Sequence, residues 1–409
     1  MTQRARIAFV VQRYGLEVCG GAELHCRLVA EHLAPYFEVH VLTSTALSYL
    51  PWDNYYAPGE STLNGVIVHR FTVDEKRDHL FFDNLTRKVF GEHHTYFDEL
   101  EWLRHVGPHC LGLLDHIKQE RDRYAAFVFF TYQYSHTYFG LQLVPEKSIL
   151  VPTAHDDRTL YLSAYRPLFH LPRVIAYNTY PERSLVEWLF DNAHVPNQVV
   201  GTGIEVPSQA DPQRFRRKFG LEGDLIVYLG RIEEAKGCPQ LFHYFTRYRD
   251  EVRRPATLVL MGRSEMSIPN RPDIVPLGFV SDQDKADGLA AASLLVAPSP
   301  HESLSMTCLE AWQSGLPVLV NAQCEVLKDN CLRSNGGLYY STYEEFATCL
   351  EVLLGDPSLR CQLGTAGRAY AEANYSWDVI VRKYLEMIAL VVGAEPAPSS
   401  NASQEGTKT

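Results

Sequence analysis

Short apolar runs alternate with segments of helical periodicity along most of the chain. In the first half, Ala22, Cys26, Val29 and Leu33 recur at helical spacing and predict a helix over about 21–34. Strands that alternate with helices predict a parallel sheet covered by helices on both faces. The apolar runs of this half, expected to be its strands, are residues 7–11, 37–44, 65–71, 125–131, 148–153 and 173–178.

The same alternation starts again in the second half. Between the halves, the segment 195–212 is rich in glycine, proline and serine, which is typical of a hinge. The sequence therefore predicts an α/β protein of two doubly wound, Rossmann-like domains that face each other across a cleft, with the ligand at the carboxyl ends of the strands. The strands expected in the second half are residues 224–230, 256–262, 274–280, 293–299 and 317–321.

This pattern divides the chain into four regions. The first domain is expected over 1–205, with a helical, aromatic insertion at about 72–120 that either shapes an acceptor site or serves packing alone. The second domain is expected over 206–374. Residues 375–393 predict a helix with a broad apolar face that packs back on the first domain, and the polar tail 394–409 is expected to be disordered.

Composition argues against several classes of protein. The 409 residues carry a net charge of −11, with acidic residues in excess in both halves, so no basic face for nucleic acid or anionic lipid is evident. The chain has 9 cysteines and no C-x-x-C pair, which fits reduced thiols better than disulfides or zinc ligands. Without a long apolar run or a signal peptide, the protein is expected to be cytoplasmic, with no indicated membrane association.

The first candidate motif is G-R-x4-K-G, directly after a strand of the second domain. Arg231 lies at the carboxyl end of the strand 224–230, and Lys236 follows one loop later. A guanidinium grips phosphate oxygens through its planar fork, and an ammonium acts as a point charge. The two cations therefore suit a diphosphate.

The second candidate motif is a pair of glutamates around a helix start. Glu302 follows the strand 293–299, and Glu310 lies further along the next helix. The two carboxylates can accept hydrogen bonds from two separate hydroxylated parts of one ligand, as in a sugar nucleotide. The backbone N–H groups that open this helix favour phosphate, and they belong to Ser303, Leu304, Ser305 and Met306.

Together these motifs resemble a known family. The E-x7-E spacing from Glu302 to Glu310, the upstream G-R-x4-K-G and the downstream G-x-P-V at 315–318 resemble the retaining GT-B glycosyltransferases of family 4, also called glycosyl transferases group 1. The resemblance covers nearly the whole chain. It implies that Glu302 binds donor-sugar hydroxyls and Glu310 binds ribose hydroxyls. It also implies that Arg231 and Lys236 hold the diphosphate and stabilise the departing nucleotide without a metal.

Further residues match positions of the same family. Gly20 and Gly21, in VCGGAE, resemble its glycine-rich first loop, where the backbone approaches donor phosphate and acceptor. His155 matches its cleft histidine, which is expected to touch the donor sugar near the reacting carbon. Gly278, Phe279 and Val280 resemble the loop of this family whose backbone contacts the nucleobase.

Two local features bear on the donor site. The family often has Gly-Phe-Gly after the first glutamate, whereas this chain has Ser303, Leu304 and Ser305, so that Ser305 brings a side chain into a tight place. The D-x-D motif at 282–284 is the metal motif of a different transferase fold, but it fits better as the cap of a helix that starts near Lys285.

The resemblance implies a transferase that moves a hexose from a UDP-sugar, or in second place a GDP-sugar, to an acceptor hydroxyl. No carboxylate is clearly placed as a covalent nucleophile, so we expect same-face attack, with the leaving phosphate oxygen taking the acceptor proton. No metal or other cofactor is expected. The expected partners are the donor and a sugar, glycan or small-molecule acceptor. A non-catalytic nucleotide-sugar-binding protein and a sugar-nucleotide epimerase of the same fold remain alternatives.

Overall fold

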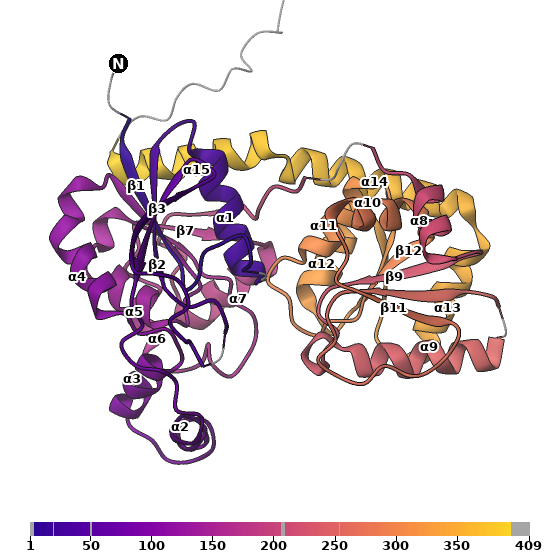
Figure 1. Ribbon diagram of the computed structural model, residues 1–409, viewed down its shortest axis with the longest axis horizontal. Coiled ribbons are helices and arrows are strands. Elements are labelled where there is room, and N and C mark those ends of the chain that lie inside the picture. Colours follow the sequence, from indigo (N-terminus) through magenta and orange to yellow (C-terminus); the bar gives the residue numbers. More distant parts are fainter. Residues whose placement is uncertain (1–3, 19, 50, 206–208, 253, 394–409) are drawn as a thin grey trace, which may run out of the picture. The chain divides into compact units, whose positions relative to one another are not determined.

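The computed structural model describes residues 4–18, 20–49, 51–205, 209–252 and 254–393, which form two compact α/β units (Figure 1). The first unit contains the chain up to Asn178, Leu185–Val200 and the chain from Ile380 onward, and the second contains Thr179–Ser184 and Gly201–Val379. The sequence predicted the boundaries after residues 205 and 374. The predicted tail, 394–409, lies outside the described residues.

The first unit is built on an eight-stranded sheet of order β3-β4-β2-β1-β5-β6-β7-β8. Its central strand β1 is flanked by parallel neighbours, with Phe9 in register with Val41 on one side and Val128 on the other. Only β3 is antiparallel to its neighbour. The strands are β1 (Arg6–Val10), β2 (Glu38–Ser44), β3 (Gly59–Leu63), β4 (Val66–Phe71), β5 (Ala126–Phe130), β6 (Ser148–Val151), β7 (Val174–Tyr177) and β8 (Asn197–Val199).

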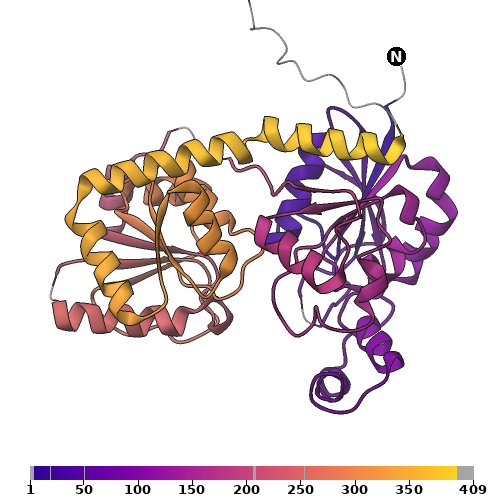
Figure 2. The same ribbon diagram turned by 180° about the vertical axis from the view of Figure 1, so that it is seen from behind.

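Helices cover the sheet of the first unit, and two of them, α2 and α3, project from the rest of the unit in both views (Figures 1 and 2). The segment 72–120, predicted as an insertion, contains α2, α3 and α4. Asp78 caps α2, and Thr95 forms a capping box with Asp98 at the start of α3. The helices are α1 (Gly21–Leu33), α2 (His79–Gly91), α3 (Tyr96–His105), α4 (Leu111–Glu120), α5 (Ser135–Leu141), α6 (Tyr165–Leu168), α7 (Tyr180–Phe190) and α15 (Trp377–Val392), of which the last two begin in residues assigned to the second unit.

The second unit has a six-stranded sheet of order β11-β10-β9-β12-β13-β14, parallel throughout. The strand order reverses between β9 and β12, and ligands of open parallel sheets bind at the carboxyl ends beside such a reversal. The strands are β9 (Leu225–Leu229), β10 (Thr257–Met261), β11 (Ile274–Gly278), β12 (Leu294–Ala297), β13 (Val318–Asn321) and β14 (Gly337–Tyr340). The helices are α8 (Pro212–Phe219), α9 (Cys238–Val252), α10 (Asp282–Ala291), α11 (Met306–Gln313), α12 (Glu325–Ser334), α13 (Tyr343–Gly355) and α14 (Pro357–Tyr375).

Several details differ from the sequence predictions. Strands β3, β8 and β14 were not expected, and β8 lies inside the predicted hinge 195–212. Helix α10 begins at Asp282 and not near Lys285, because the Ser281 side chain accepts a hydrogen bond from the Asp284 backbone N–H. The D-x-D carboxylates therefore lie in the first turn of a helix, where the helix dipole favours negative charge.

The state of the cysteines and the presence of membrane-spanning helices can be stated for the described residues. The eight cysteines in that part of the chain are free thiols, and Cys19 lies outside it. No helix in the described part of the chain is both long enough and apolar enough to cross a bilayer.

Candidate active site

The loop after β9 packs directly on the loop after β12. A short 3-10 turn, Glu234–Lys236, ends at Gly237, whose φ of 73° lies in the left-handed region. A Cβ atom at this position would overlap the carbonyl oxygen of Pro298. Glycine is therefore required here both for the turn and for the close approach of the two loops.

This packing brings Lys236 and Glu302 together. Lys236 Nζ donates to Glu302 Oε1 at 2.7 Å, and the two side chains are 32% and 20% exposed. They come from the carboxyl ends of adjacent strands, beside the reversal in strand order. The structure thus unites one residue from each of the two candidate motifs in a partly exposed ion pair.

Arg231 belongs to the same loop but has another partner. Its guanidinium lies 3.0 Å from Glu233 Oε1, and its side chain is 62% exposed. The hydroxyl of Tyr228 donates to the Arg231 carbonyl oxygen and fixes the backbone at the end of β9. Within the described residues, no hydrogen bond or ion pair joins Arg231 to Lys236 or Glu302.

The turn from β12 into α11 contains the unusual Ser305. Its φ of 65° is left-handed, and it directly precedes the first residue of α11, Met306. The Asn330 side chain donates to the carbonyl oxygen of Leu304 at 3.3 Å and so stabilises the turn. Glycine accepts this backbone conformation more readily than serine does, which gives a physical reason for the usual glycine at this place. Ser303, two residues earlier, is half-buried.

Glu310, in α11, is paired with a lysine of α10. Lys285 Nζ donates to Glu310 Oε1 at 2.8 Å, and the two side chains are 25% and 12% exposed. Asp282 lies at 3.5 Å from the same ammonium. Burial lowers the pKa of Lys285, but Glu310 and then Asp282 raise it, and the net shift is upward. Glu310 was predicted from the sequence, whereas Lys285 as its partner was not.

The loop after β11 is open to solvent. Gly278 ends the strand with a φ of 68°, and the next side chain, Phe279, is 70% exposed. The guanidinium of Arg263, from the loop after β10, lies 5.9 Å from the centre of the Phe279 ring. Val280 completes this predicted loop and is half-buried. An exposed ring beside a cation offers a surface on which a planar base can stack.

In the first unit, Gly20 and Gly21 begin α1 above a buried ion pair. Gly20 is the N-cap residue, and a Cβ atom there would overlap the carboxylate of Glu23. Glu23 accepts from two nitrogens of Arg13, at 2.9 and 2.6 Å, and both side chains are buried. The carboxylate of this pair thus lies directly against Gly20, a contact that the sequence motif did not reveal.

His155 follows β6 and is oriented by a carboxylate. Its Nε2 lies 3.0 Å from Asp157 Oδ2, with 36% and 28% of the two side chains exposed. Burial raises the pKa of Asp157, but hydrogen bonds and charge from His155, together with the backbone N–H groups of Thr159 and Leu160, lower it by more. The net shift of the Asp157 pKa is therefore downward. An ionised Asp157 therefore faces the histidine and fixes its ring.

The comparisons with known proteins agree with this geometry. Residues 223–356 match the family model described as glycosyl transferases group 1. A D-inositol 3-phosphate glycosyltransferase of Frankia alni is 27% identical over an alignment that covers 92% of this chain and 95% of that protein. The structure of a sucrose-phosphate synthase from Thermosynechococcus elongatus matches with a TM-score of 0.68 at 16% identity, over 93% of this chain and 97% of that one. The chain is a glycosyltransferase with the GT-B fold, and its residues 223–356 resemble the glycosyl transferases of group 1.

The fold and the enzyme class predicted from the sequence are thereby confirmed, and the match over residues 223–356 supports the predicted family. A further relative of this glycosyltransferase, a mannosylfructose-phosphate synthase of Agrobacterium fabrum, is 29% identical over 47% of this chain and 45% of its own. An Anabaena protein solved in complex with UDP and glucose shares the fold, with a TM-score of 0.67 at 14% identity over 94% of this chain and 100% of that one.

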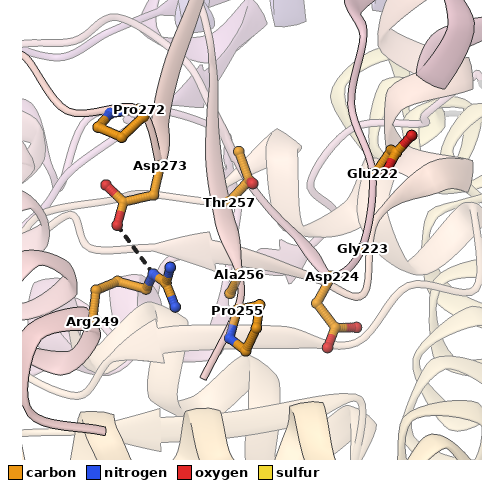
Figure 3. A pocket seen from close by; sticks show the side chains of 9 residues that line it. All are labelled: Glu222, Gly223, Asp224, Arg249, Pro255, Ala256, Thr257, Pro272 and Asp273. Atoms are coloured by element: carbon orange, nitrogen blue, oxygen red, sulfur yellow. Dashed lines mark hydrogen bonds and ion pairs between the residues drawn. The ribbon is translucent and has the colours of Figure 1, made fainter. Parts of the chain in front are cut away.

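The glycosyltransferase also has a surface pocket away from these residues (Figure 3). It has a volume of about 310 Å³ and lies at the amino ends of β9, β10 and β11. Within it, Arg249 Nε donates to Asp273 Oδ2 at 3.0 Å. No predicted site residue lines it, so the candidate chemistry lies at the opposite edge of the sheet. Its lining residues are Glu222, Gly223, Asp224, Arg249, Pro255, Ala256, Thr257, Pro272 and Asp273.

Proposed function

We propose that this glycosyltransferase transfers a hexose from a nucleotide diphosphate sugar to an acceptor hydroxyl with retention at the anomeric carbon. A UDP-sugar is the favoured donor and a GDP-sugar the second choice. The observation that carries the proposal is the Lys236–Glu302 pair at 2.7 Å, at the carboxyl ends of β9 and β12. A cation and a carboxylate side by side there suit the diphosphate and the sugar of one donor.

Binding of the donor would exchange the partners of this pair. The diphosphate attracts Lys236 and the exposed Arg231, because both can approach its oxygens with full positive charge. Glu302, released from the ammonium, then accepts hydrogen bonds from the hexose hydroxyls. The two cations stabilise the negative charge that develops on the departing nucleotide, so the site can act without a metal ion.

The proposed step balances without a further reactant. The bond from the anomeric carbon to the diphosphate oxygen breaks, and the acceptor oxygen bonds to the same face of that carbon. The acceptor proton passes to the leaving phosphate oxygen. His155, oriented by Asp157, is assigned to the donor sugar near the reacting carbon. The acceptor is proposed to be a sugar, a glycan or a small molecule with a free hydroxyl.

The relatives support this assignment by their names. The Frankia alni protein is named a D-inositol 3-phosphate glycosyltransferase, and the Agrobacterium fabrum protein is named a mannosylfructose-phosphate synthase. The Anabaena structure contains UDP and glucose. These names favour a nucleotide-sugar donor and a hydroxylated acceptor for this chain as well.

The test is a transfer assay with UDP- and GDP-hexoses, with EDTA or with Mg²⁺, on Lys236→Ala, Glu302→Ala and the control Lys328→Ala. Lys328 forms an ion pair with Glu325 at 3.6 Å within one helix, so its loss controls for removal of a surface charge. We expect turnover to fall on the order of 100-fold or more in the first two variants only, and to persist in EDTA. NMR of the product should show the anomeric configuration of the donor. Unchanged turnover in both site variants would refute the proposal.

A further inference from the structure

Each glutamate of the E-x7-E motif is held by its own lysine. Lys236 Nζ lies 2.7 Å from Glu302 Oε1, and Lys285 Nζ lies 2.8 Å from Glu310 Oε1. Lys236 belongs to the G-R-x4-K-G motif, whereas Lys285 belongs to none of the motifs in the sequence. The second pair is the more buried, at 25% and 12% exposure against 32% and 20%.

The second pair links two helices that start at the same edge of the sheet. Lys285 is in the first turn of α10, which follows β11, and Glu310 is in the second turn of α11, which follows β12. Both strands are parallel members of one sheet, so both helices begin at its carboxyl edge. The Lys285 ammonium therefore lies at the edge to which the nucleotide is assigned.

Glu310 is the principal partner of Lys285. The other carboxylate near the ammonium, Asp282, is 3.5 Å away and 90% exposed, so solvent screens it. Asp284, also in the first turn of α10, is engaged by Lys218 at 2.7 Å. Since only Oε1 of Glu310 has a partner among the described residues, its second oxygen is available to a ligand.

We propose that Lys285 is a positioning residue of the nucleotide site, which fixes Oε1 of Glu310 so that Oε2 recognises the ribose, and that the site thereby selects ribonucleoside over deoxyribonucleoside diphosphates. The inference rests on the proposed function and on the expectation, from the family resemblance of the sequence, that Glu310 binds the ribose hydroxyls. A carboxylate fixed through one oxygen presents the other in a single direction, and a hydroxyl that donates to it forms a charge-assisted hydrogen bond. A sugar without that hydroxyl leaves the poorly exposed carboxylate oxygen without a donor.

The test compares the affinity of UDP, GDP and ADP with that of their 2′-deoxy and 3′-deoxy counterparts by calorimetric titration. We expect the native protein to prefer the ribonucleotide that it binds on the order of 10-fold or more over at least one deoxy form. Lys285→Met should reduce this ratio to below about 3-fold, and Lys285→Arg should restore most of it. The matched control is Lys218→Met in α8, which removes an ion pair of 2.7 Å to Asp284 of α10 and should keep the native ratio.

A merely structural role of Lys285 would weaken ribo- and deoxyribonucleotides equally. An unchanged ratio in Lys285→Met, or a native protein without preference for the ribose, would therefore overturn the inference while the proposed function stands. If none of the nucleotides binds the native protein, the proposed function itself fails and the inference fails with it. If Lys285→Met does not fold, Lys285→Gln and Glu310→Gln provide the same comparison, and both should lose the preference.

Discussion

At the scale of single residues, Ser305 combines a side chain with a backbone conformation that suits glycine. Its φ is 65° and its ψ 76°, a region that costs a residue with a Cβ about 1–2 kcal/mol. Ser305→Gly removes this cost but adds backbone entropy to the unfolded chain. We expect the free energy of unfolding to rise by about 1 kcal/mol, measured by urea denaturation.

Ser303 in the same turn is the control for this substitution. Its φ is not positive, so Ser303→Gly adds unfolded-state entropy without relieving strain. That variant should be unchanged or less stable than the native protein. If both substitutions had the same effect, the left-handed conformation of Ser305 would not be a source of strain.

His69 provides a pH-dependent term in the stability of the first unit. His40 Nδ1 lies 2.7 Å from His69 Nε2, so one proton is shared between two stacked rings of adjacent strands. Burial, then His40 and His116, lower the pKa of His69 from 6.5 to about 4. A folded-state pKa below the unfolded value means that this stabilisation is complete above pH 6.5 and is lost as the pH falls toward 4.

Urea denaturation at pH 7.5 and pH 5 measures this effect. The shift in the His69 pKa predicts a loss of roughly 2 kcal/mol in the free energy of unfolding between these two values. His69→Gln should lose correspondingly less on acidification. His170→Gln, at an exposed ring stacked on His194, should follow the native protein. Equal pH dependence in all three proteins would contradict the assignment.

At the scale of elements, Gly237 decides how closely the loops after β9 and β12 approach. Gly237→Ala meets both a left-handed φ of 73° and the Pro298 carbonyl oxygen. Gly223→Ala meets a comparable φ of 70° but no neighbouring atom, so it isolates the backbone cost of about 1–2 kcal/mol. We expect Gly237→Ala to destabilise the protein beyond this control, because backbone at a packed loop does not move without loss of contacts.

The same substitution should act on the Lys236–Glu302 pair. If the two loops separate, the ammonium loses its position relative to the carboxylate, and nucleotide affinity falls in Gly237→Ala but not in Gly223→Ala. Calorimetric titration with UDP or GDP measures this. Equal affinity in both variants would show that the loop approach does not position the site.

The elements that could be predicted from the sequence are those with a strong local signal. The buried apolar strands, such as β9 and β12, were predicted to within about two residues at each end. A strand that is buried on both faces has a continuous apolar sequence, which is easy to recognise. The edge strand β3, with the polar sequence GESTL, gave no such signal, since its pairing with β4 comes from backbone hydrogen bonds. The site followed the same rule. Glu302 and Glu310 were visible from their spacing, whereas Lys285 is 25 residues from its partner Glu310 and no periodicity encodes that contact.

At the scale of the whole molecule, the two units have separate hydrophobic cores. The core of the first contains Trp52 and Trp102, and that of the second contains residues such as Phe245 and Leu319. Two units with separate cores can unfold in separate transitions, so each unit has its own free energy of unfolding. A ligand that binds one unit should then stabilise that unit alone.

Differential scanning calorimetry with UDP or GDP tests this consequence. A ligand at 100 times its Kd adds about 2.7 kcal/mol to the state that binds it, or roughly 5–10 °C for a unit of this size. We therefore expect two transitions, and the nucleotide should raise the midpoint temperature of only one of them. Gly262→Ala should lower the midpoint of that same transition, because a Cβ atom there would overlap the Gly230 carbonyl oxygen within the second unit. Lys236→Ala should abolish the nucleotide shift without merging the transitions. A single transition that moves as a whole would instead mean that the two cores unfold together, and the ligand energy would then be distributed over the entire chain.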